Sequence, residues 1–190
     1  MNRKVTLGLL AGGLATRLGG VDKAWLLRDG IPQVVRWQRR FGHQVDAVLV
    51  SSNRDPGPFA SLGIRVVVDR VGDGGPLSGL DALAQACGTD WLLTLPVDLV
   101  GVNDCLLPSL LAGAGEVGAY ARDGDGPQPL VALWQVGRLR AAAPLALARG
   151  DLAIHVLQAQ LGLHEVRFDG VRFGNINTPG DLAACGATTQ

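Results

Sequence analysis

The chain has 190 residues, of which 47% are hydrophobic and 18% charged, and its formal net charge at pH 7 is zero. A chain of this size can bury about 70% of its unfolded surface, so we expect a single domain spanning residues 1–190. The balanced charge argues against a nucleic-acid-binding protein, because the largest basic cluster is only Arg36, Arg39 and Arg40. We interpret these three arginines as the outer face of a helix.

The three cysteines are odd in number and lack Cys-x-x-Cys spacing, which predicts neither a disulfide framework nor a zinc site. No apolar run approaches the roughly 18 residues of a membrane span, and the strand predicted over residues 5–10 is too short for the apolar core of a signal peptide. We therefore expect a cytoplasmic monomer that contacts no membrane.

Apolar runs alternate with helical patterns along the first half of the chain. We predict strands over residues 5–10, 47–51, 65–68 and 91–95, and helices over residues 31–41 and 77–87. Alternation at this spacing is typical of a parallel sheet with right-handed crossovers. We expect residues 1–100 to form a nucleotide-binding half.

The second half has a different pattern. We predict helices over residues 105–111, 139–148 and 152–161, strands over 118–121, 130–134 and 164–168, and a short last helix over 181–185 that begins at Pro179. The turn at residues 123–126 predicts that the first two of these strands form an antiparallel pair. The sheet is therefore expected to be mixed but mostly parallel, in a three-layer α/β sandwich whose residues 101–190 cover an acceptor substrate.

The segment Leu10–Lys23 has the composition of a phosphate-binding loop, with four glycines directly after a buried strand. Glycines allow backbone N–H groups to approach an anion, and Arg17 and Lys23 can supply charge. Five residues separate Gly13 from Gly19, one more than a Walker A loop allows, and no Gly-x-Gly-x-x-Gly fingerprint occurs. A flexible glycine turn is the alternative interpretation.

Lys23 favours the phosphate interpretation. The chain has 15 arginines but only two lysines, Lys4 and Lys23. An ammonium group in this loop suggests a need for a compact charge on a flexible stem that can follow a phosphate through a reaction.

Polar residues follow three other predicted strands. Asp69 and Asp98 lie at carboxyl ends of strands, where a carboxylate is well placed to hold Mg²⁺ together with phosphate oxygens. Helix capping or turn formation is the alternative role for each. Asn53 could contact a ribose or base, or simply form a turn, and Gly75 opens a helix whose N–H groups could face a phosphate.

One set of segments shares a pattern with a known family: Leu10-Ala11-Gly12-Gly13, Arg17, Gly19-Gly20-Val21-Asp22-Lys23, Asn53, Asp69, Gly75-Pro76-Leu77-Ser78-Gly79, Asp98 and Asn175-Ile176-Asn177-Thr178-Pro179. These segments closely resemble the molybdenum cofactor guanylyltransferase family, and the resemblance extends over nearly the whole chain. It implies a Rossmann-like nucleotidyltransferase fold of the nucleotide-diphospho-sugar transferase type.

The resemblance also implies an activity, which is Mg²⁺-dependent transfer of GMP from GTP to the terminal phosphate of molybdopterin. Implied GTP-binding residues are Leu10, Ala11, Gly12, Gly13, Lys23, Asn53, Asp69, Gly75 and Asp98. Asp98 would hold the metal, and Lys23 and Arg17 would neutralise the departing pyrophosphate. Asn175 and Asn177 would lie toward the pterin. Implied partners are GTP, molybdopterin and, transiently, other molybdenum cofactor proteins.

Two alternatives stay open at this level. One is a related nucleotidyltransferase that uses CTP or another nucleoside triphosphate with a different phosphate acceptor. The other is a GTP-binding protein without catalytic activity.

Overall fold

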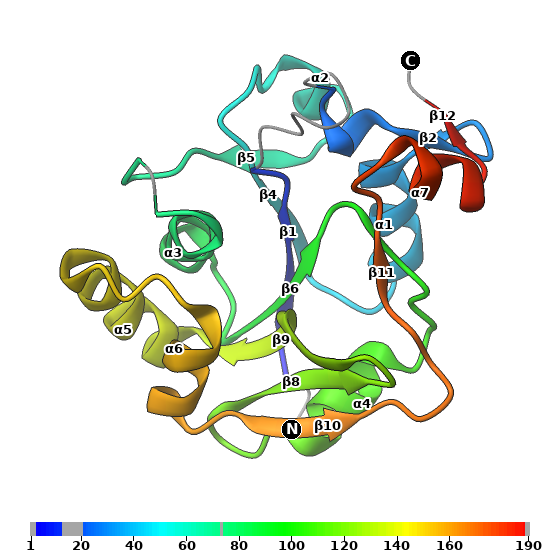
Figure 1. Cartoon of the computed structure of the whole chain (residues 1–190). Coiled ribbons are helices and arrows are strands. Elements are labelled where there is room, and N and C mark those ends of the chain that lie inside the picture. Colours follow the sequence, from blue (N-terminus) through cyan, green and yellow to red (C-terminus); the bar gives the residue numbers. More distant parts are fainter. Residues whose placement is uncertain (1–2, 13–20, 73, 189–190) are drawn as a thin grey trace.

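A computed structural model of the chain describes residues 3–12, 21–72 and 74–188 (Figure 1). Its centre is a seven-stranded sheet with the strand order β10-β8-β9-β6-β1-β4-β5. The strands are β1 (Val5–Leu10), β4 (Ala47–Ser51), β5 (Arg65–Val67), β6 (Trp91–Pro96), β8 (Gly118–Asp123), β9 (Gly126–Gln135) and β10 (His164–Arg167).

The sheet is mixed and mostly parallel, as the sequence predicts. Within it, β9 runs antiparallel to both of its neighbours, β6 and β8, and every other adjacent pair is parallel. The predicted antiparallel turn is confirmed, because Asp123 pairs with Gly126 where β8 meets β9. All strands except β9 therefore end at one edge of the sheet, and this edge carries the candidate site.

Helices cover both faces of the sheet and make three layers (Figure 1). One face carries α1 (Gln33–Phe41), α2 (Gly57–Ala60) and α4 (Leu106–Gly113), and the other carries α3 (Pro76–Ala86), α5 (Val136–Arg149) and α6 (Ile154–Leu161). The chain ends near α7 (Pro179–Ala184). Among the described residues, no helix combines the length and the apolar character needed to cross a membrane.

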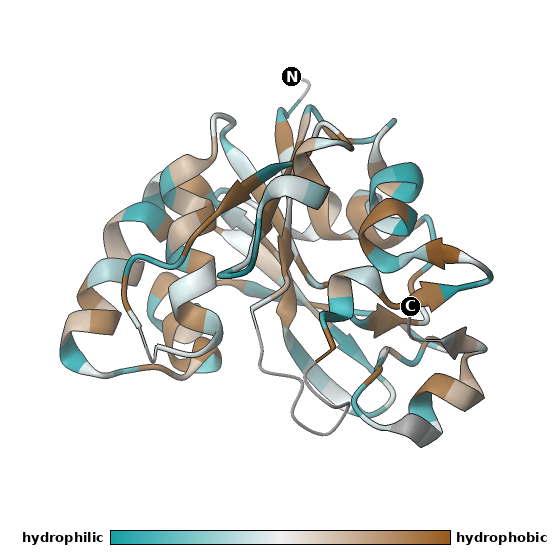
Figure 2. Ribbon diagram, turned by 90° about the horizontal axis from the view of Figure 1, so that it is seen from above, coloured by the Kyte–Doolittle hydropathy of each residue, from teal (hydrophilic) through white to brown (hydrophobic). Residues whose placement is uncertain are grey.

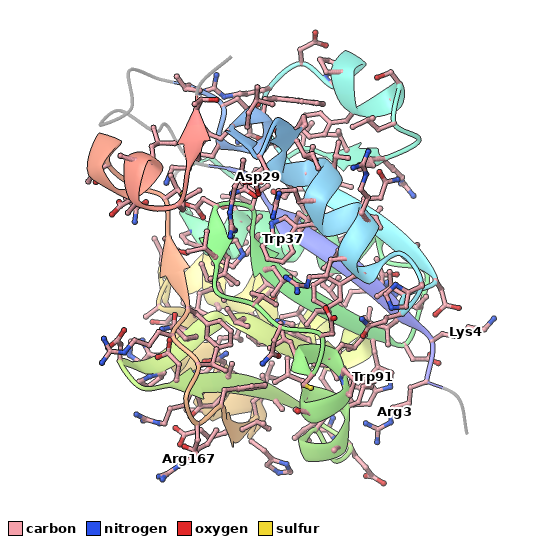
Figure 3. All side chains as sticks on the ribbon, turned by 90° about the vertical axis from the view of Figure 1, so that its right-hand side faces the viewer. Arg3, Lys4, Asp29, Trp37, Trp91 and Arg167 are labelled. Carbon is pink, nitrogen blue, oxygen red and sulfur yellow. The ribbon has the colours of Figure 1, made fainter. Side chains whose placement is uncertain are left out.

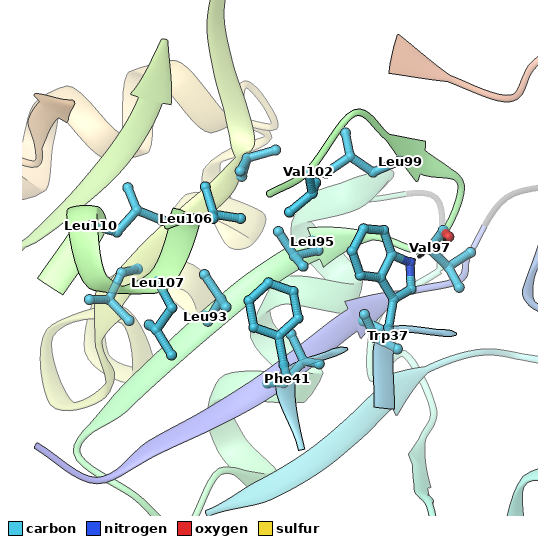
Figure 4. Close-up of a cluster of buried hydrophobic side chains, with 14 of the residues drawn as sticks. Trp37, Phe41, Leu93, Leu95, Val97, Leu99, Val102, Leu106, Leu107 and Leu110 are labelled. Carbon is cyan, nitrogen blue, oxygen red and sulfur yellow. Dashed lines mark hydrogen bonds between the residues drawn. The ribbon is translucent and has the colours of Figure 1, made fainter. Parts of the chain in front are cut away.

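The two-residue period of the strands divides the core into two clusters. Leu93 and Leu95 of β6 are fully buried in the cluster beneath α1 and α4, whereas Leu92 is buried in the cluster beneath α3 and α5. Figure 4 shows Trp37 and Phe41 of α1 packed over this first cluster. Hydrophobic positions accordingly concentrate on the central strands, with hydrophilic positions on the surrounding helices and loops (Figure 2).

The amino end of β1 is fixed by a cation–π contact. The guanidinium carbon of Arg3 lies 4.5 Å from the ring centroid of Trp91 at the start of β6 (Figure 3). Arg3 also donates a 2.7 Å hydrogen bond to the carbonyl of Gly115, so it ties the first strand to the end of α4.

Two predicted helices begin two residues later than expected. The helix predicted over 31–41 starts at Gln33, because Pro32 is in an extended conformation as its N-cap and residues Ile31–Pro32 form strand β3. The helix predicted over 152–161 starts at Ile154. Strand β3 pairs with β2 (Leu27–Arg28), which in turn pairs with β12 (Ala187–Thr188) near the carboxyl end.

A second small pairing joins two distant segments. Strand β7 (Leu99–Val100) pairs antiparallel with β11 (Gly174–Asn175), so the last part of the chain lies beside the residue that follows β6. Two-residue strands have no period to detect, which is why the sequence does not predict either small sheet. This pairing places Asn175 beside the Asp98 segment.

Candidate functional site

A cleft of about 200 Å³ lies at the carboxyl edge of the sheet. Six of the predicted site residues line it: Leu10, Gly12, Asp69, Gly75, Asp98 and Asn175. Because β1, β4, β5 and β6 are parallel, the residues that follow them meet at this edge. The sequence pattern thus identifies one cavity from residues spread over most of the chain.

Four further predicted residues, Ala11, Asn53, Lys23 and Asn177, attach to the cleft through hydrogen bonds. Ala11 donates its backbone N–H to the Ser51 carbonyl at 2.9 Å, Asn53 bonds to Asp69, and Lys23 bonds to Asn177. The remaining two predicted residues, Gly13 and Arg17, lie outside the described residues, and their predicted roles stay predictions.

Lys23 forms the central polar contact of the site. Its Nζ donates to Asp98 Oδ2 at 2.6 Å and to Asn177 Oδ1 at 2.6 Å. The side chains of Lys23 and Asp98 are only 18% and 13% exposed. Asp98 Oδ1 has no hydrogen-bond partner within the part of the chain that the structure describes. The contact therefore joins three distant segments and leaves one carboxylate oxygen available to a ligand.

A short 3-10 helix, η2 (Lys23–Trp25), holds Lys23 in place. Asp22 is its N-cap and accepts the Ala24 N–H at 3.0 Å through its side chain. Ala24 is fully buried, and the Trp25 ring lies 4.9 Å from the ring of Phe59 in α2. These contacts fix the backbone beneath the lysine.

Backbone hydrogen bonds on three sides hold the Asp98 segment. Val97 donates its N–H to the Leu10 carbonyl at 3.0 Å and accepts the Trp37 indole N–H at 2.9 Å (Figure 4). Ile176 donates to the Asp98 carbonyl at 3.0 Å. Asp98 is thus positioned by the first strand, by α1 and by the carboxyl-terminal segment.

Asn177 is oriented by the cap of the following helix. Thr178 is the N-cap of α7 and forms a capping box with Asp181. Asp181 Oδ2 also accepts the Asn177 N–H at 2.9 Å. Hydrogen bonds from Asn177 and Thr178, together with the nearby charge of Lys23, lower the pKa of Asp181 from its ordinary value. Asp181 therefore stays ionised and fixes the backbone at Asn177.

Asp69 and Asn53 form a reciprocal pair. The Asn53 Nδ2 donates to Asp69 Oδ2, and the Asp69 backbone N–H donates to Asn53 Oδ1, each at 3.0 Å. The buried Ser51 hydroxyl donates to Asp69 Oδ1, also at 3.0 Å. Asp69 therefore caps no helix, and its carboxylate is presented to the cleft by groups at the end of β4.

Two glycines allow the start of helix α3 to lie close to the same edge of the sheet. Gly75 lies at its N-cap with φ of 55°, in the left-handed region that favours glycine. At Gly79 an added Cβ would lie 2.6 Å from Ser51 Oγ and 3.0 Å from Leu10 Cδ2. The close approach keeps the first turn of α3 against β1 and β4.

The variant Gly79→Ala is expected to lower the free energy of unfolding by about 1–3 kcal/mol, because its methyl group overpacks a buried contact. Urea denaturation measures this loss. Gly180→Ala is the matched control in α7, since its Cβ would stand 3.6 Å from Thr178 Oγ1 in ordinary contact, with an expected change within about 0.5 kcal/mol. Equal stability of the two variants would contradict the packing argument.

Asp123 organises the second half of the edge at the end of β8. Its Oδ2 accepts the buried Phe173 N–H at 2.6 Å, and its Oδ1 accepts the N–H groups of Asp125 and Gly126 and the Gln128 side chain. Burial alone would raise the pKa of Asp123, but these hydrogen bonds outweigh it and hold the pKa below its ordinary value of 3.8. The carboxylate anchors the segment that leads into β11.

This shift predicts a pH dependence of stability. Since the folded pKa is depressed, the stabilisation from Asp123 is complete above pH 3.8 and is lost as the pH falls through the folded value. Asp123→Asn should lower the free energy of unfolding at neutral pH by about 1–3 kcal/mol. Urea denaturation of both proteins across the acidic range should show the two curves converging below pH 3.8. A constant gap would contradict the assignment.

Sequence reasoning gave no role to several residues that position the site. Asp22, Ser51, Thr178 and Asp181 hold the predicted residues through the bonds above. A signal for part of this exists, because Thr178-Pro179-Gly180-Asp181 has the spacing of a capping box. Ser51 has no comparable signal, since only the folded sheet places it beside Asp69.

Comparison with known proteins agrees with this geometry. Residues 8–164 match the family model of the MobA-like NTP transferase domain. The chain is 41% identical over 182 residues to a protein of Cereibacter sphaeroides named molybdenum cofactor guanylyltransferase, and the match covers 92% of each chain. A protein of the same name from Yersinia pseudotuberculosis is 32% identical over 185 residues, covering 95% of this chain and 94% of the relative.

Solved structures share the fold. Molybdopterin-guanine dinucleotide biosynthesis protein A from Archaeoglobus fulgidus superposes with a TM-score of 0.68 at 20% identity, covering 95% of this chain and 96% of that one. The 2-C-methyl-D-erythritol 4-phosphate cytidylyltransferase from Thermus thermophilus also gives 0.68, at 19% identity and 97% coverage of both chains. The nucleotidyltransferase fold and the resemblance inferred from the sequence are both confirmed, and the chain belongs to the molybdenum cofactor guanylyltransferase family of MobA-like NTP transferases.

Proposed function

We propose that the protein transfers GMP from GTP to the terminal phosphate of molybdopterin, forming molybdopterin guanine dinucleotide and pyrophosphate. Membership of the family supports this reaction. The observation that carries it is the Lys23 contact, in which one ammonium group meets Asp98 and Asn177 beside the cleft. A compact cation at this point suits a triphosphate on one side and an acceptor phosphate on the other.

The chemistry requires alignment and charge stabilisation more than a general base. The acceptor phosphate is already a nucleophile, and its attack on the α-phosphorus of GTP releases pyrophosphate. Lys23 would neutralise charge on the phosphates during this step. Arg17 is proposed to assist it. The side chain of Lys23 is 18% exposed, so most of its surface is covered by the protein.

The residues present suit a magnesium ion. Asp98 has a carboxylate oxygen without a partner, and Asp69 lines the same cleft. Within the described part of the chain, no three His, Cys, Asp or Glu side chains form a complete metal site. This fits Mg²⁺, which usually binds one or two carboxylates and takes phosphate oxygens as further ligands. When bound, the ion would supply Lewis-acid charge and a template for the phosphates.

The nucleotide and the acceptor are assigned to different sides of the cleft. Leu10, Gly12 and Gly75 approach it from β1 and α3 and would contact GTP, while Asp69 is presented to it by Asn53. Asn175 and Asn177 come from the carboxyl-terminal segment and would face the pterin. Asp123 supports that segment through Phe173.

Isothermal titration calorimetry with GTP and CTP in the presence of Mg²⁺ tests the nucleotide assignment. We expect GTP to bind and CTP to bind more weakly or not at all. A clear preference for CTP would contradict the proposed GMP transfer and would indicate a related cytidylyltransferase instead.

A further inference from the structure

A second and larger cavity lies away from the cleft, beside α1. Its volume is about 630 Å³, within the range of roughly 300–1,000 Å³ that small-molecule sites occupy. Its walls come from β2, from α1 and from the loop that follows β7. None of the residues assigned to GTP or pterin lines it.

The cavity carries an excess of positive charge. Arg28, Arg36, Arg39 and Arg40 line it, with Asp104 as the acidic residue among its lining side chains. Arg40 is paired with Asp104 at 2.9 Å and Arg36 with Asp29 at 3.1 Å, so the excess comes from Arg28 and Arg39. Three of these arginines are those that the sequence assigned to the outer face of a helix. That interpretation is incomplete, because α1 turns them toward a shared hollow.

The inner wall contains an unsatisfied hydrogen-bond donor. Gln33 is only 1% exposed and lines the cavity, and its Nε2 has no hydrogen-bond partner among the described residues. A buried amide donor without a partner costs free energy unless a ligand or water satisfies it. Less than 1 Å² of Nε2 is accessible, so this amide lies just behind the cavity surface, as an unused donor in the wall that carries the arginines.

Trp37 closes the wall next to Gln33. Its ring is 5% exposed and lines the cavity, and its indole N–H donates to the Val97 carbonyl at 2.9 Å (Figure 4). The packing of the ring and this hydrogen bond hold this part of the wall in place. A hollow of this volume suits a small anion, and an acidic protein surface is the alternative that the test below distinguishes.

We infer that this cavity is a binding site for a small phosphate-bearing anion, separate from the nucleotide cleft. Guanidinium groups match phosphate oxygens in pairs. Gln33 lies in the same wall, so its side-chain amide should report when the cavity is occupied. Both free inorganic phosphates and the phosphates of a nucleotide have this chemistry. The inference does not depend on the guanylyl transfer proposed above.

Nuclear magnetic resonance of the full ¹⁵N-labelled chain tests the site. Sodium phosphate, sodium pyrophosphate and GMP are titrated separately at constant ionic strength, and the side-chain amide of Gln33 is followed after assignment by Gln33→Leu. We expect a saturable shift of this amide with at least one of the three probes. The probe that saturates at the lowest concentration distinguishes a free phosphate from a nucleotide.

Variants of the arginines test whether the anion binds in this cavity. The double variant Arg36→Gln/Arg39→Gln should weaken the Gln33 response about tenfold or more, and Arg39→Gln alone is a milder form if the double variant is unstable. Arg138→Gln is the matched control on the exposed surface of α5 and should bind as the original chain does. Lys23→Ala should likewise leave the response unchanged.

Three outcomes would overturn the inference. One is that no probe shifts the Gln33 amide. Another is that the shift survives in both arginine variants but disappears in Lys23→Ala, which would place the anion in the nucleotide cleft. The third is that only an oligoglutamate peptide, titrated in parallel, produces the shift, which would assign the surface to an acidic protein partner.

Discussion

Replacing Lys23 with alanine is expected to slow GMP transfer about 100- to 1,000-fold, a loss of about 3–4 kcal/mol of transition-state stabilisation. The reason is geometric as well as electrostatic. Lys23 is held by η2 within 2.6 Å of both Asp98 and Asn177, so the chain has a preorganised cation where phosphate charge would develop. The rate of pyrophosphate release with GTP, Mg²⁺ and molybdopterin measures the effect.

The chain supplies a matched control, because Lys4 is the only other lysine and is exposed near the amino terminus. Lys4→Ala should turn over at the original rate. Lys23→Arg should recover only part of the lost rate, since the guanidinium is bulkier and Asp98 and Asn177 already flank the ammonium. If Lys23→Ala kept the original rate while remaining folded, Lys23 would have no catalytic role.

The variant Asp98→Asn is expected to lose a comparable factor of about 100- to 1,000-fold, for a different reason. Asparagine keeps the shape of the side chain but removes the charge that Mg²⁺ would require. The rate of GMP transfer should therefore fall, and it should no longer depend on the Mg²⁺ concentration. Measuring turnover over a series of Mg²⁺ concentrations separates this from a general loss of structure.

GTP affinity in the presence of a chelator gives the complementary readout for Asp98→Asn. With the carboxylate gone, Lys23 keeps its charge and loses its anionic partner, so metal-free GTP should bind at least as tightly as it does to the original chain. Weaker metal-free binding with near-normal turnover in Mg²⁺ would contradict the metal assignment and leave Asp98 as a structural partner of the lysine.

Much of the fold follows from local patterns. The largely apolar runs at Val5–Leu10 and Ala47–Ser51 form strands with the predicted bounds, because a short apolar run in an α/β chain has few alternatives to a strand of the parallel core. One boundary was wrong because a proline fitted two structures. Pro32 fits the first turn of a helix, yet it lies in β3 and caps the helix that follows.

The residues of the candidate site could be predicted from the sequence. The hydrogen bonds that hold them together could not. Asp69 and Asp98 could be identified because strand ends converge at one edge of a parallel sheet. The bonds that hold them depend on long-range contacts, such as Lys23 meeting Asn177 across most of the chain. Tertiary pairing of β7 with β11 creates that contact, and no local pattern encodes it.

The arginines of the basic cavity are a second case in which a local pattern predicts the element but not its surroundings. Helical spacing correctly placed Arg36, Arg39 and Arg40 on α1, and their charge suggested solvent exposure. The loop after β7 supplies the opposite wall, so the arginines face a hollow that periodicity alone cannot reveal.

The most direct test of the central claim is a reconstituted transfer assay. The purified chain is mixed with Mg²⁺, molybdopterin and either GTP or CTP, and the dinucleotide product and pyrophosphate are measured together. The account predicts molybdopterin guanine dinucleotide and an equal amount of pyrophosphate with GTP, and little product with CTP. Product formed from CTP but not from GTP, or nucleotide binding without any product, would contradict it.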